Sequence, residues 1–154
     1  MLRIYLDSSV IGGVFDVEFR TDSSRLFDYA RLGLIKIVIS DVVVREIDAA
    51  PEQVRLFLAG IPVDQIEYIE TGVDAKQLAE AYIEKGVVGE KWLDDAIHVA
   101  NASLAHVDCI VSWNFKHIVR LDRIKGFNAV NFSMNHEALT ILSPKEVLLD
   151  ESDK

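Results

Sequence analysis

The stretch Lys91–Ser112, KWLDDAIHVANASLAHVDCIVS, decides the fold class. Its first part is the clearest amphipathic helix of the chain, because seven apolar residues share one broad helical face. These residues are Trp92, Leu93, Ala96, Ile97, Val99, Ala100 and Leu104. The short apolar run Cys109–Ser112 follows directly and predicts a buried strand. A helix that leads straight into a buried strand is typical of a parallel sheet covered by helices.

The same alternation extends on both sides of this stretch. Short apolar runs predict further strands at Leu2–Leu6, Ile35–Ile39, Ile66–Ile69 and Thr140–Leu142. Helical spacing or capping residues predict helices at Phe19–Leu32, from Ser40 or Asp41 onward, from Pro51 to about Ala59, at Asp74–Lys85, at Ile124–Phe132 and from Ser143-Pro144. We therefore expect a three-layer α/β/α sandwich with a mostly parallel central sheet.

Length and composition indicate one domain. The chain has 154 residues, half of them hydrophobic, with no repeat and no Pro/Gly-rich linker. We assign residues 1–149 to the domain and residues 150–154 to a polar tail. Cys109 is the only cysteine, which excludes an intrachain disulfide and a cysteine-based metal site. With no apolar run long enough for a membrane span and no signal-peptide pattern, a cytoplasmic protein is expected.

The formal charge of −9, from 25 acidic and 16 basic residues, argues by itself against tight binding of nucleic acid. Two interpretations of the excess acid remain open. Some carboxylates cluster to hold a cation, or the surface is simply acidic, which favours solubility.

Four polar residues stand where a parallel sheet gathers its ligands, at strand ends or in the helices that follow them. Asp7 closes the first predicted strand, and Asn114 follows the strand Cys109–Ser112. Glu46 and Asp95 lie in helices that follow connections from the sheet edge. Each has an ordinary structural explanation: a helix cap for Asp7, an ion pair for Glu46, a favourable helix-dipole position for Asp95 and a turn for Asn114.

If these side chains converge on one point, a metal site becomes a better explanation than four separate structural roles. Three carboxylates held together repel each other, and a divalent cation relieves the cost. Mg²⁺ and Mn²⁺ are hard ions that prefer oxygen ligands. A bound ion of this kind can activate water and stabilise charge on a phosphodiester.

The chain resembles the PIN domain family, in particular the small VapC-like toxins. The resemblance is carried in order by residues 5–12 (YLDSSVIG), 40–47 (SDVVVREI), 94–100 (DDAIHVA) and 111–118 (VSWNFKHI), and ends at 141–144 (ILSP). It implies a metal-dependent ribonuclease with Mg²⁺ or Mn²⁺ in an acidic pocket. Such toxins generally form homodimers and are inhibited by an antitoxin that wraps the toxin and blocks this pocket.

By position, the resemblance assigns metal binding and catalysis to Asp7, Glu46 and Asp95, with Ser9 in support. Asp95 is preferred to Asp94 because it directly precedes Ala96-Ile97-His98. Asn114 takes the fourth catalytic position, where many relatives carry Asp. An amide brings no charge, so this departure weakens a second metal more than the first.

A basic segment that follows Asn114 is the candidate contact to the RNA backbone, through Lys116, Arg120 and Arg123. A solvated basic helix face is the alternative. Trp113 and Phe115 could stack on bases, or pack in the core. His98 and His117 receive no catalytic role. Apolar residues between Phe15 and Phe27 are a candidate antitoxin-docking surface, with core packing as the alternative.

Two other functions compete with the toxin ribonuclease. A PIN-like domain of weak or no activity could serve as an RNA- or protein-binding module, which Asn114 and the acidic charge favour. An acidic-site phosphatase or phospho-receiver is disfavoured, because Ser9 stands where a phosphatase needs a second Asp and no suitable Asp ends the second strand.

Overall fold

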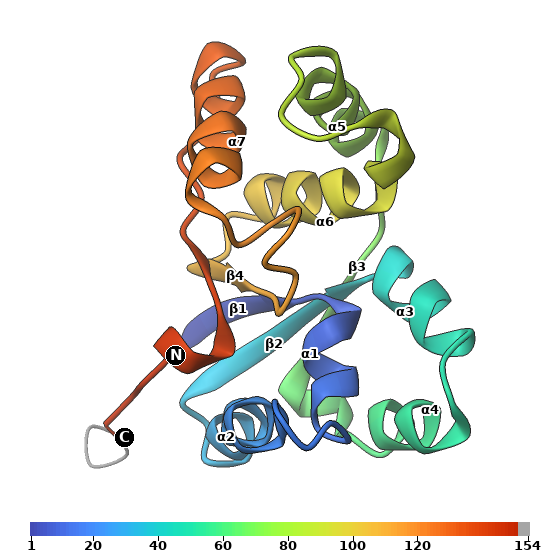
Figure 1. Ribbon diagram of the computed structural model, residues 1–154. Helices are drawn as coiled ribbons and strands as arrows, with labels where there is room; N and C mark the ends of the chain where they lie inside the picture. Colours follow the sequence, from blue (N-terminus) through green and yellow to red (C-terminus); the bar gives the residue numbers. More distant parts are fainter. Residues whose placement is uncertain (151–154) are drawn as a thin grey trace.

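The computed structural model describes residues 1–150, and its centre is a five-stranded sheet (Figure 1). The strands are β1 (Leu2–Leu6), β2 (Ile35–Ser40), β3 (Ile66–Ile69), β4 (Cys109–Val111) and β5 (Ile141–Leu142). Their order across the sheet is β3-β2-β1-β4-β5, and all four pairings are parallel. The predicted parallel sheet is confirmed. Residues 151–154 of the predicted polar tail lie outside the described residues.

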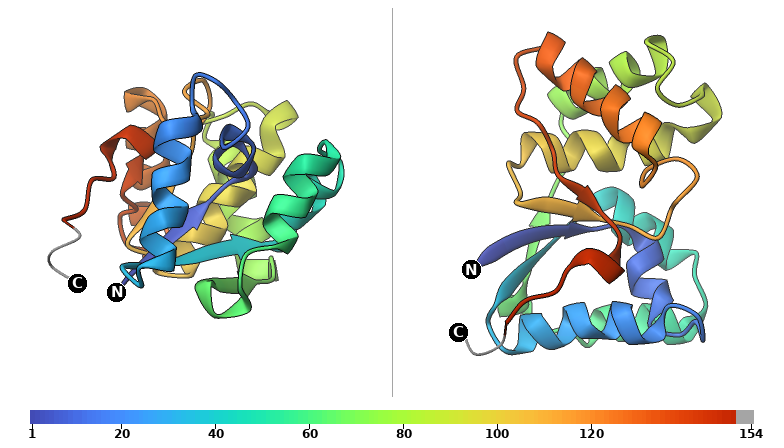
Figure 2. Two further views of the ribbon diagram at one scale, coloured as in Figure 1. Left: turned by 90° about the horizontal axis from the view of Figure 1, so that it is seen from below. Right: turned by 60° about the vertical axis from the view of Figure 1, so that its left-hand side comes forward.

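Helices cover both faces of the sheet and complete the predicted three layers. They are α1 (Ser8–Gly13), α2 (Arg20–Arg31), α3 (Asp41–Asp48), α4 (Glu52–Ala59), α5 (Val73–Glu84), α6 (Leu93–Leu104) and α7 (Leu121–Ser133). Short 3₁₀ turns form η1 (Val63–Gln65), η2 (Glu90–Trp92) and η3 (Pro144–Glu146). Figures 1 and 2 show α5, α6 and α7 on one side of the sheet and α1, α2 and α4 on the other.

The central strands are apolar on both faces because helices lie above and below them. Ile4, Tyr5 and Leu6 are consecutive and almost fully buried, which is the pattern of a parallel strand and not of a half-exposed one. Ile4 pairs in register with Ile37 on one side and Cys109 on the other. β1 is therefore the middle of the hydrophobic core, and the residue that follows it is held firmly.

The N-terminal ends of three helices, α4, α6 and α7, differ from the predictions. α7 begins at Leu121 and not at Ile124, and its first turn, which contains Asp122 and Arg123, is exposed or half-buried. Lys91 and Trp92, where the helix was predicted to begin, belong to the 3₁₀ turn η2, and α6 starts only at Leu93. Pro51 is the N-cap of α4 and does not lie within its first turn.

The order of the strands places a crevice between β1 and β4. From β1 the chain builds the sheet outward through β2 and β3, and then returns to the other side of β1 for β4 and β5. Ligands in open α/β sheets bind at the carboxyl ends of the strands where the order reverses in this way. Asp7 directly follows β1 and Ser112 directly follows β4, so both stand at this crevice.

Candidate active site

Asp7 does not act as a helix cap. It occupies the N-cap position of α1, but its side chain makes no capping hydrogen bond. Instead, Oδ1 accepts a hydrogen bond from Oγ of Ser9 at 2.6 Å, and Oδ2 accepts one from Oγ of Ser112 at 2.5 Å. Only 4% of Asp7 is exposed. The structural explanation expected for this residue is therefore absent, and a buried carboxylate stands at the crevice.

Glu46 comes from α3 and reaches a histidine on α6. Its Oε1 lies 2.6 Å from Nε2 of His98 and accepts a hydrogen bond from Oγ of Ser8 at 3.2 Å. On the other side of the His98 ring, Nδ1 lies 2.8 Å from the hydroxyl of Tyr5, which in turn lies 2.7 Å from Oγ of Ser40. A polar chain thus crosses the core from the end of β2 to the carboxylate of Glu46.

Asp95 is paired with the second buried histidine. Its Oδ2 lies 3.2 Å from Nδ1 of His117, whose ring stacks on Trp92 with the centroids 4.0 Å apart. The neighbouring acid, Asp94, points elsewhere and forms an exposed ion pair with Arg45 at 2.8 Å. Asp94 and Asp95 therefore have different partners, although both border the hollow described below.

The pKa values show that the three acids share one electrostatic environment. Burial raises the pKa of Asp7, against the opposing effects of His98 and the two serine hydroxyls, and the charge of Glu46 raises it further. Burial likewise raises the pKa of Asp95, and the charges of Asp7 and Glu46 add to the rise despite His98 and His117. The charge of Glu46 therefore disfavours ionisation of both aspartates, and the charge of Asp7 disfavours ionisation of Asp95.

Glu46 differs from the two aspartates, because its pKa is lowered by His98. Burial opposes the charge on Glu46, but the hydrogen bond and charge of His98, with the Ser8 hydroxyl, outweigh it and lower the pKa of Glu46. Burial also opposes a charge on His98, and the hydrogen bond to Glu46, with the charges of Asp7, Glu46 and Asp95, raises its pKa. One acid of the three is therefore stabilised in its ionised form.

Asn114 lies beside the acids, but its side chain is engaged in a turn. Its Oδ1 accepts hydrogen bonds from the backbone N–H groups of Lys116 at 3.2 Å and His117 at 2.9 Å. The backbone N–H of Asn114 donates to Oγ of Ser112 at 2.9 Å. Asn114 thus shapes the loop that carries His117 toward Asp95, and its catalytic role stays a prediction.

These groups border a hollow of about 490 Å³. Its lining residues are Glu46, Lys91, Trp92, Leu93, Asp94, Asp95, Asn114 and His117. Three of the four predicted catalytic residues therefore share one hollow, while Asp7 is buried next to it through its contacts with Ser9 and Ser112. Glu46 also lines a second, adjoining hollow of about 420 Å³ together with Ser8 and Ser9.

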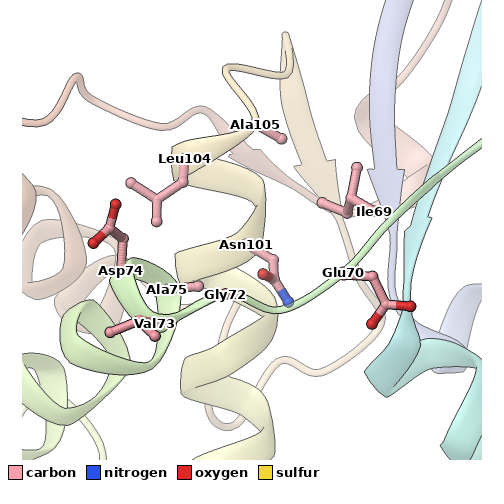
Figure 3. Close-up of a pocket in the computed structure, with 9 residues that line it drawn as sticks. All are labelled: Ile69, Glu70, Gly72, Val73, Asp74, Ala75, Asn101, Leu104 and Ala105. Atoms are coloured by element: carbon pink, nitrogen blue, oxygen red, sulfur yellow. The ribbon is translucent and has the colours of Figure 1, made fainter.

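A third hollow, of about 350 Å³, lies between the end of β3, the start of α5 and the end of α6 (Figure 3). It contains none of the predicted site residues. Figure 3 draws its two acids, Glu70 and Asp74, on opposite sides of Asn101. Asn101 donates a hydrogen bond to Oγ1 of Thr71 at 2.8 Å. This hollow gathers no convergent set of acids, so the chemistry is better placed at the crevice between β1 and β4.

The predicted basic contacts differ in their availability. Arg120 is tied to Asp122 by two hydrogen bonds, at 2.6 and 2.7 Å. Arg123 donates to the backbone carbonyl of Val87 and is half-buried. Lys116 is exposed. Lys91, to which the sequence assigned no role, lines the hollow and lies 5.2 Å over the ring of Trp92.

The two aromatic residues of the loop divide between core and surface. Trp113 is 6% exposed, stacks on Phe19 with the centroids 4.1 Å apart and donates from Nε1 to Oγ of Ser23. Phe115 is 47% exposed. Trp113 is therefore the core residue of the pair, and Phe115 alone is available to a base.

The site offers oxygen ligands of the kind that a divalent metal ion prefers, but these ligands are not already arranged around one point. Within residues 1–150, no three His, Cys, Asp or Glu side chains are grouped closely enough to hold an ion. Asp7, Glu46 and Asp95 nevertheless supply the oxygen ligands that Mg²⁺ and Mn²⁺ prefer. Across the same residues, neither Oε2 of Glu46 nor Oδ1 of Asp95 accepts a hydrogen bond. These two oxygens are free for an ion.

Sequence reasoning missed the partners of the acids. His98, His117 and Ser112 each contact one predicted acid, and Lys91 faces the hollow. The available signal for His98 was its place three residues after Asp95 on one helix, which puts the two on neighbouring positions of one face. His117 and Ser112 carried no comparable signal, because they approach the acids only through tertiary folding.

The arrangement defines an α/β/α protein with an acidic site at the reversal point of a parallel sheet. No protein-family model and no curated protein matches the chain by sequence. Solved structures do match its fold. The crystal structure of FitAcB from Neisseria gonorrhoeae aligns with a TM-score of 0.59 at 12% identity, covering 94% of this chain and 99% of that one.

Two further structures are similar to the same extent. VapBC2 from Rickettsia felis, bound to a DNA fragment from its promoter, gives a TM-score of 0.57 at 12% identity over 92% of this chain and 98% of that one. VapC20 from Mycobacterium tuberculosis, a toxin that cleaves the sarcin–ricin loop, gives 0.58 at 12% identity over 74% and 92%. The chain therefore has a PIN-like, VapC-type fold.

Proposed function

We propose that this protein is an endoribonuclease dependent on Mg²⁺ or Mn²⁺ and the toxin of a type II toxin–antitoxin pair. The observation that carries the proposal is the approach of Asp7, Glu46 and Asp95 at the crevice between β1 and β4, where two of the three carboxyl groups have raised pKa values. Carboxylates that oppose each other's charge are stabilised by a cation. The VapC-type fold supports the same function.

The chain's own residues have defined parts in this reaction. Asp7, Glu46 and Asp95 would hold the ion, with Ser9 orienting Asp7 through its hydrogen bond and Asn114 shaping the adjoining loop. When bound, the ion would supply positive charge that activates a water and stabilises the phosphodiester transition state. In-line attack of water on phosphorus would break the bond to the 3′-oxygen and give a 3′-hydroxyl and a 5′-phosphate.

The experiment is cleavage of a mixed RNA pool by the purified protein, with Mg²⁺, with Mn²⁺ and with EDTA. Asp7→Asn and Asp95→Asn should abolish metal-dependent cleavage. Asp94→Asn is the matched control, because Asp94 is the adjacent acid but pairs with Arg45 on the surface, and it should cleave like the wild type. Wild-type activity in Asp7→Asn would refute the assignment of the site.

A binding module without nuclease activity is the second candidate. The observation in its favour is Asn114, which brings no charge and whose Oδ1 is already engaged by two backbone N–H groups. RNA binding by folded protein that cleaves under neither metal would support this function in place of the first.

Partner proteins belong to the same proposal. The VapBC2 and FitAcB structures support an antitoxin as the partner. Within the segment from Phe15 to Phe27, Val17 is 88% exposed and Phe15 is 37% exposed, whereas Leu26 and Phe27 are buried in the core. We propose the exposed end of this segment as part of the antitoxin-docking surface and a homodimer as the assembled toxin. Expression of the chain alone should arrest bacterial growth, and co-expression of the antitoxin gene should relieve the arrest.

A further inference from the structure

His98 is the buried side chain that connects Glu46 to polar groups in the core. It is 2% exposed, and both ring nitrogens have partners: Nε2 lies 2.6 Å from Oε1 of Glu46, and Nδ1 lies 2.8 Å from the hydroxyl of Tyr5. The Tyr5 hydroxyl lies a further 2.7 Å from Oγ of Ser40. All four side chains belong to different elements or their ends, so the chain of contacts is a product of the tertiary fold.

The chemistry of the partners sets the direction of these hydrogen bonds. An ionised carboxylate can only accept, so Nε2–H of His98 must donate to Glu46. In the neutral ring Nδ1 accepts from the Tyr5 hydroxyl, whereas in the protonated ring, which the raised pKa of His98 favours, Nδ1–H donates to it. The Tyr5 hydroxyl, which also contacts Ser40, can take both parts. In either state the group presented to Glu46 is Nε2–H.

The two carboxylate oxygens of Glu46 therefore have different surroundings. Oε1 accepts from His98 and from Ser8, whereas Oε2 accepts no hydrogen bond from residues 1–150. We propose that His98 is a positioning residue that fixes the carboxylate of Glu46 so that Oε2 is offered to the divalent ion. This inference rests on the proposed metal-dependent function.

The helix that carries His98 gives it a second effect on the same site. His98 follows Asp95 by three residues on α6, so the two side chains leave neighbouring positions on one face. The hydrogen bond from His98 on this helix to Glu46 on α3 therefore constrains the spacing between Asp95 and Glu46. These are the two acids with a carboxylate oxygen that accepts no hydrogen bond from residues 1–150. Hydrogen bonds that hold metal ligands in this way typically contribute about 10- to 100-fold to metal affinity.

The test is Mn²⁺ binding, measured by titration calorimetry on the full chain without RNA. In His98→Gln the amide nitrogen takes the place of Nε2 and can still donate to Glu46, whereas in His98→Asn it takes the place of Nδ1 and cannot reach. We expect His98→Asn to weaken Mn²⁺ binding about 10- to 100-fold, and His98→Gln to recover most of the loss. A role in packing alone would not separate the two amides.

Two further variants complete the design. Tyr5→Phe keeps the imidazole but removes the hydroxyl that holds Nδ1. It should weaken Mn²⁺ binding relative to the wild type, by less than the loss expected for His98→Asn, and wild-type affinity in Tyr5→Phe would count against the inference. This variant tests the inference even if His98→Asn fails to fold. His106→Asn is the matched control, because His106 lies two residues beyond the end of the same helix, is exposed and has a positive φ of 54° that Asn also adopts. It should bind like the wild type.

The outcomes separate the inference from the proposed function. Wild-type Mn²⁺ affinity in His98→Asn would overturn the positioning role and leave the metal site standing. Equal losses in His98→Asn and His98→Gln would also overturn it, because the Nε2 donor would then have no special part. Absence of Mn²⁺ binding by the wild type would overturn the proposed function together with this inference.

Discussion

Oδ2 of Asp7 accepts a hydrogen bond of 2.5 Å from Oγ of Ser112, and this contact joins the carboxyl ends of the two strands that flank the crevice. Ser9 donates to the other oxygen, Oδ1, at 2.6 Å. Both hydrogen-bond partners are neutral hydroxyls, no Arg or Lys among residues 1–150 forms an ion pair with Asp7, and the charge of His98 offsets only part of the effect of burial. Burial consequently raises the pKa of Asp7. The contact between Asp7 and Ser112 therefore marks the position of the site, and the burial that accompanies it makes ionised Asp7 unfavourable for folding.

The first prediction concerns that cost. A pKa that is higher in the folded than in the unfolded chain means that ionised Asp7 opposes folding at neutral pH, and that the penalty fades as the pH falls from the folded pKa to the unfolded one. In EDTA at pH 7, Asp7→Asn should melt above the wild type, by roughly 2–4 °C for each kcal/mol relieved. The gap should narrow toward pH 4.5. A variant that melts lower at pH 7 would contradict this account.

Divalent ions should remove the same penalty by binding. A ligand at 100 times its Kd stabilises the folded state by about 2.7 kcal/mol, or roughly 5–10 °C for a chain of this length. Thermal melts of the wild type and of Asp94→Asn should rise with Mg²⁺ or Mn²⁺, while those of Asp7→Asn and Asp95→Asn should stay level. An equal rise in all four proteins would place the ion elsewhere.

Lys91 should contribute more to RNA binding than Arg120. Lys91 borders the hollow, whereas Arg120 is neutralised by its bidentate pair with Asp122. In anisotropy titrations with single-stranded RNA in EDTA, Lys91→Ala should weaken binding. It should also reduce the slope of log K against log salt by about 0.7. Arg120→Ala should leave both quantities near their wild-type values, and a larger loss in Arg120→Ala would refute this ranking.

Asn131 should be a stability residue with no part in catalysis. It is fully buried, accepts from the Tyr82 hydroxyl and donates to Oγ of Ser103 at 3.0 Å, thereby joining α5, α6 and α7. Asn131→Ala removes these buried hydrogen bonds, leaving the Tyr82 hydroxyl only its 3.5 Å contact with Ser103, and should lower the free energy of unfolding by roughly 1–3 kcal/mol. Urea denaturation measures the loss. Phe132→Ala, at an 84% exposed neighbour, is the control and should change little.

The membrane expectation rests on a simple length argument. Within residues 1–150, no helix combines the length and the apolar character that a membrane span requires. The longest helices, such as α7, are also interrupted by charged residues on their outer face, as the exposed Asp122 illustrates.

The sequence by itself determined the layers of this fold and singled out the three acids that we propose as its site. Periodicity is a local property, so runs such as Ile35–Ile39 and the apolar face of Leu93–Leu104 predicted strands and helices without knowledge of their neighbours. Asp7 could be singled out because it ends a buried strand, and parallel strands bring such ends to one edge. The four ordered motifs added the likeness to VapC toxins, which the fold confirms.

Only the tertiary structure decided what these acids contact. Glu46 and His98 are 52 residues apart in the chain, and Asp7 and Ser112 are 105 apart. Helical or strand periodicity carries no information at such separations, because it records which face of an element is buried and not which partner lies there. The same holds for Arg123, whose charge predicted an RNA contact but whose guanidinium donates to the carbonyl of Val87. Local pattern selects the elements, whereas packing of the three layers selects the partners.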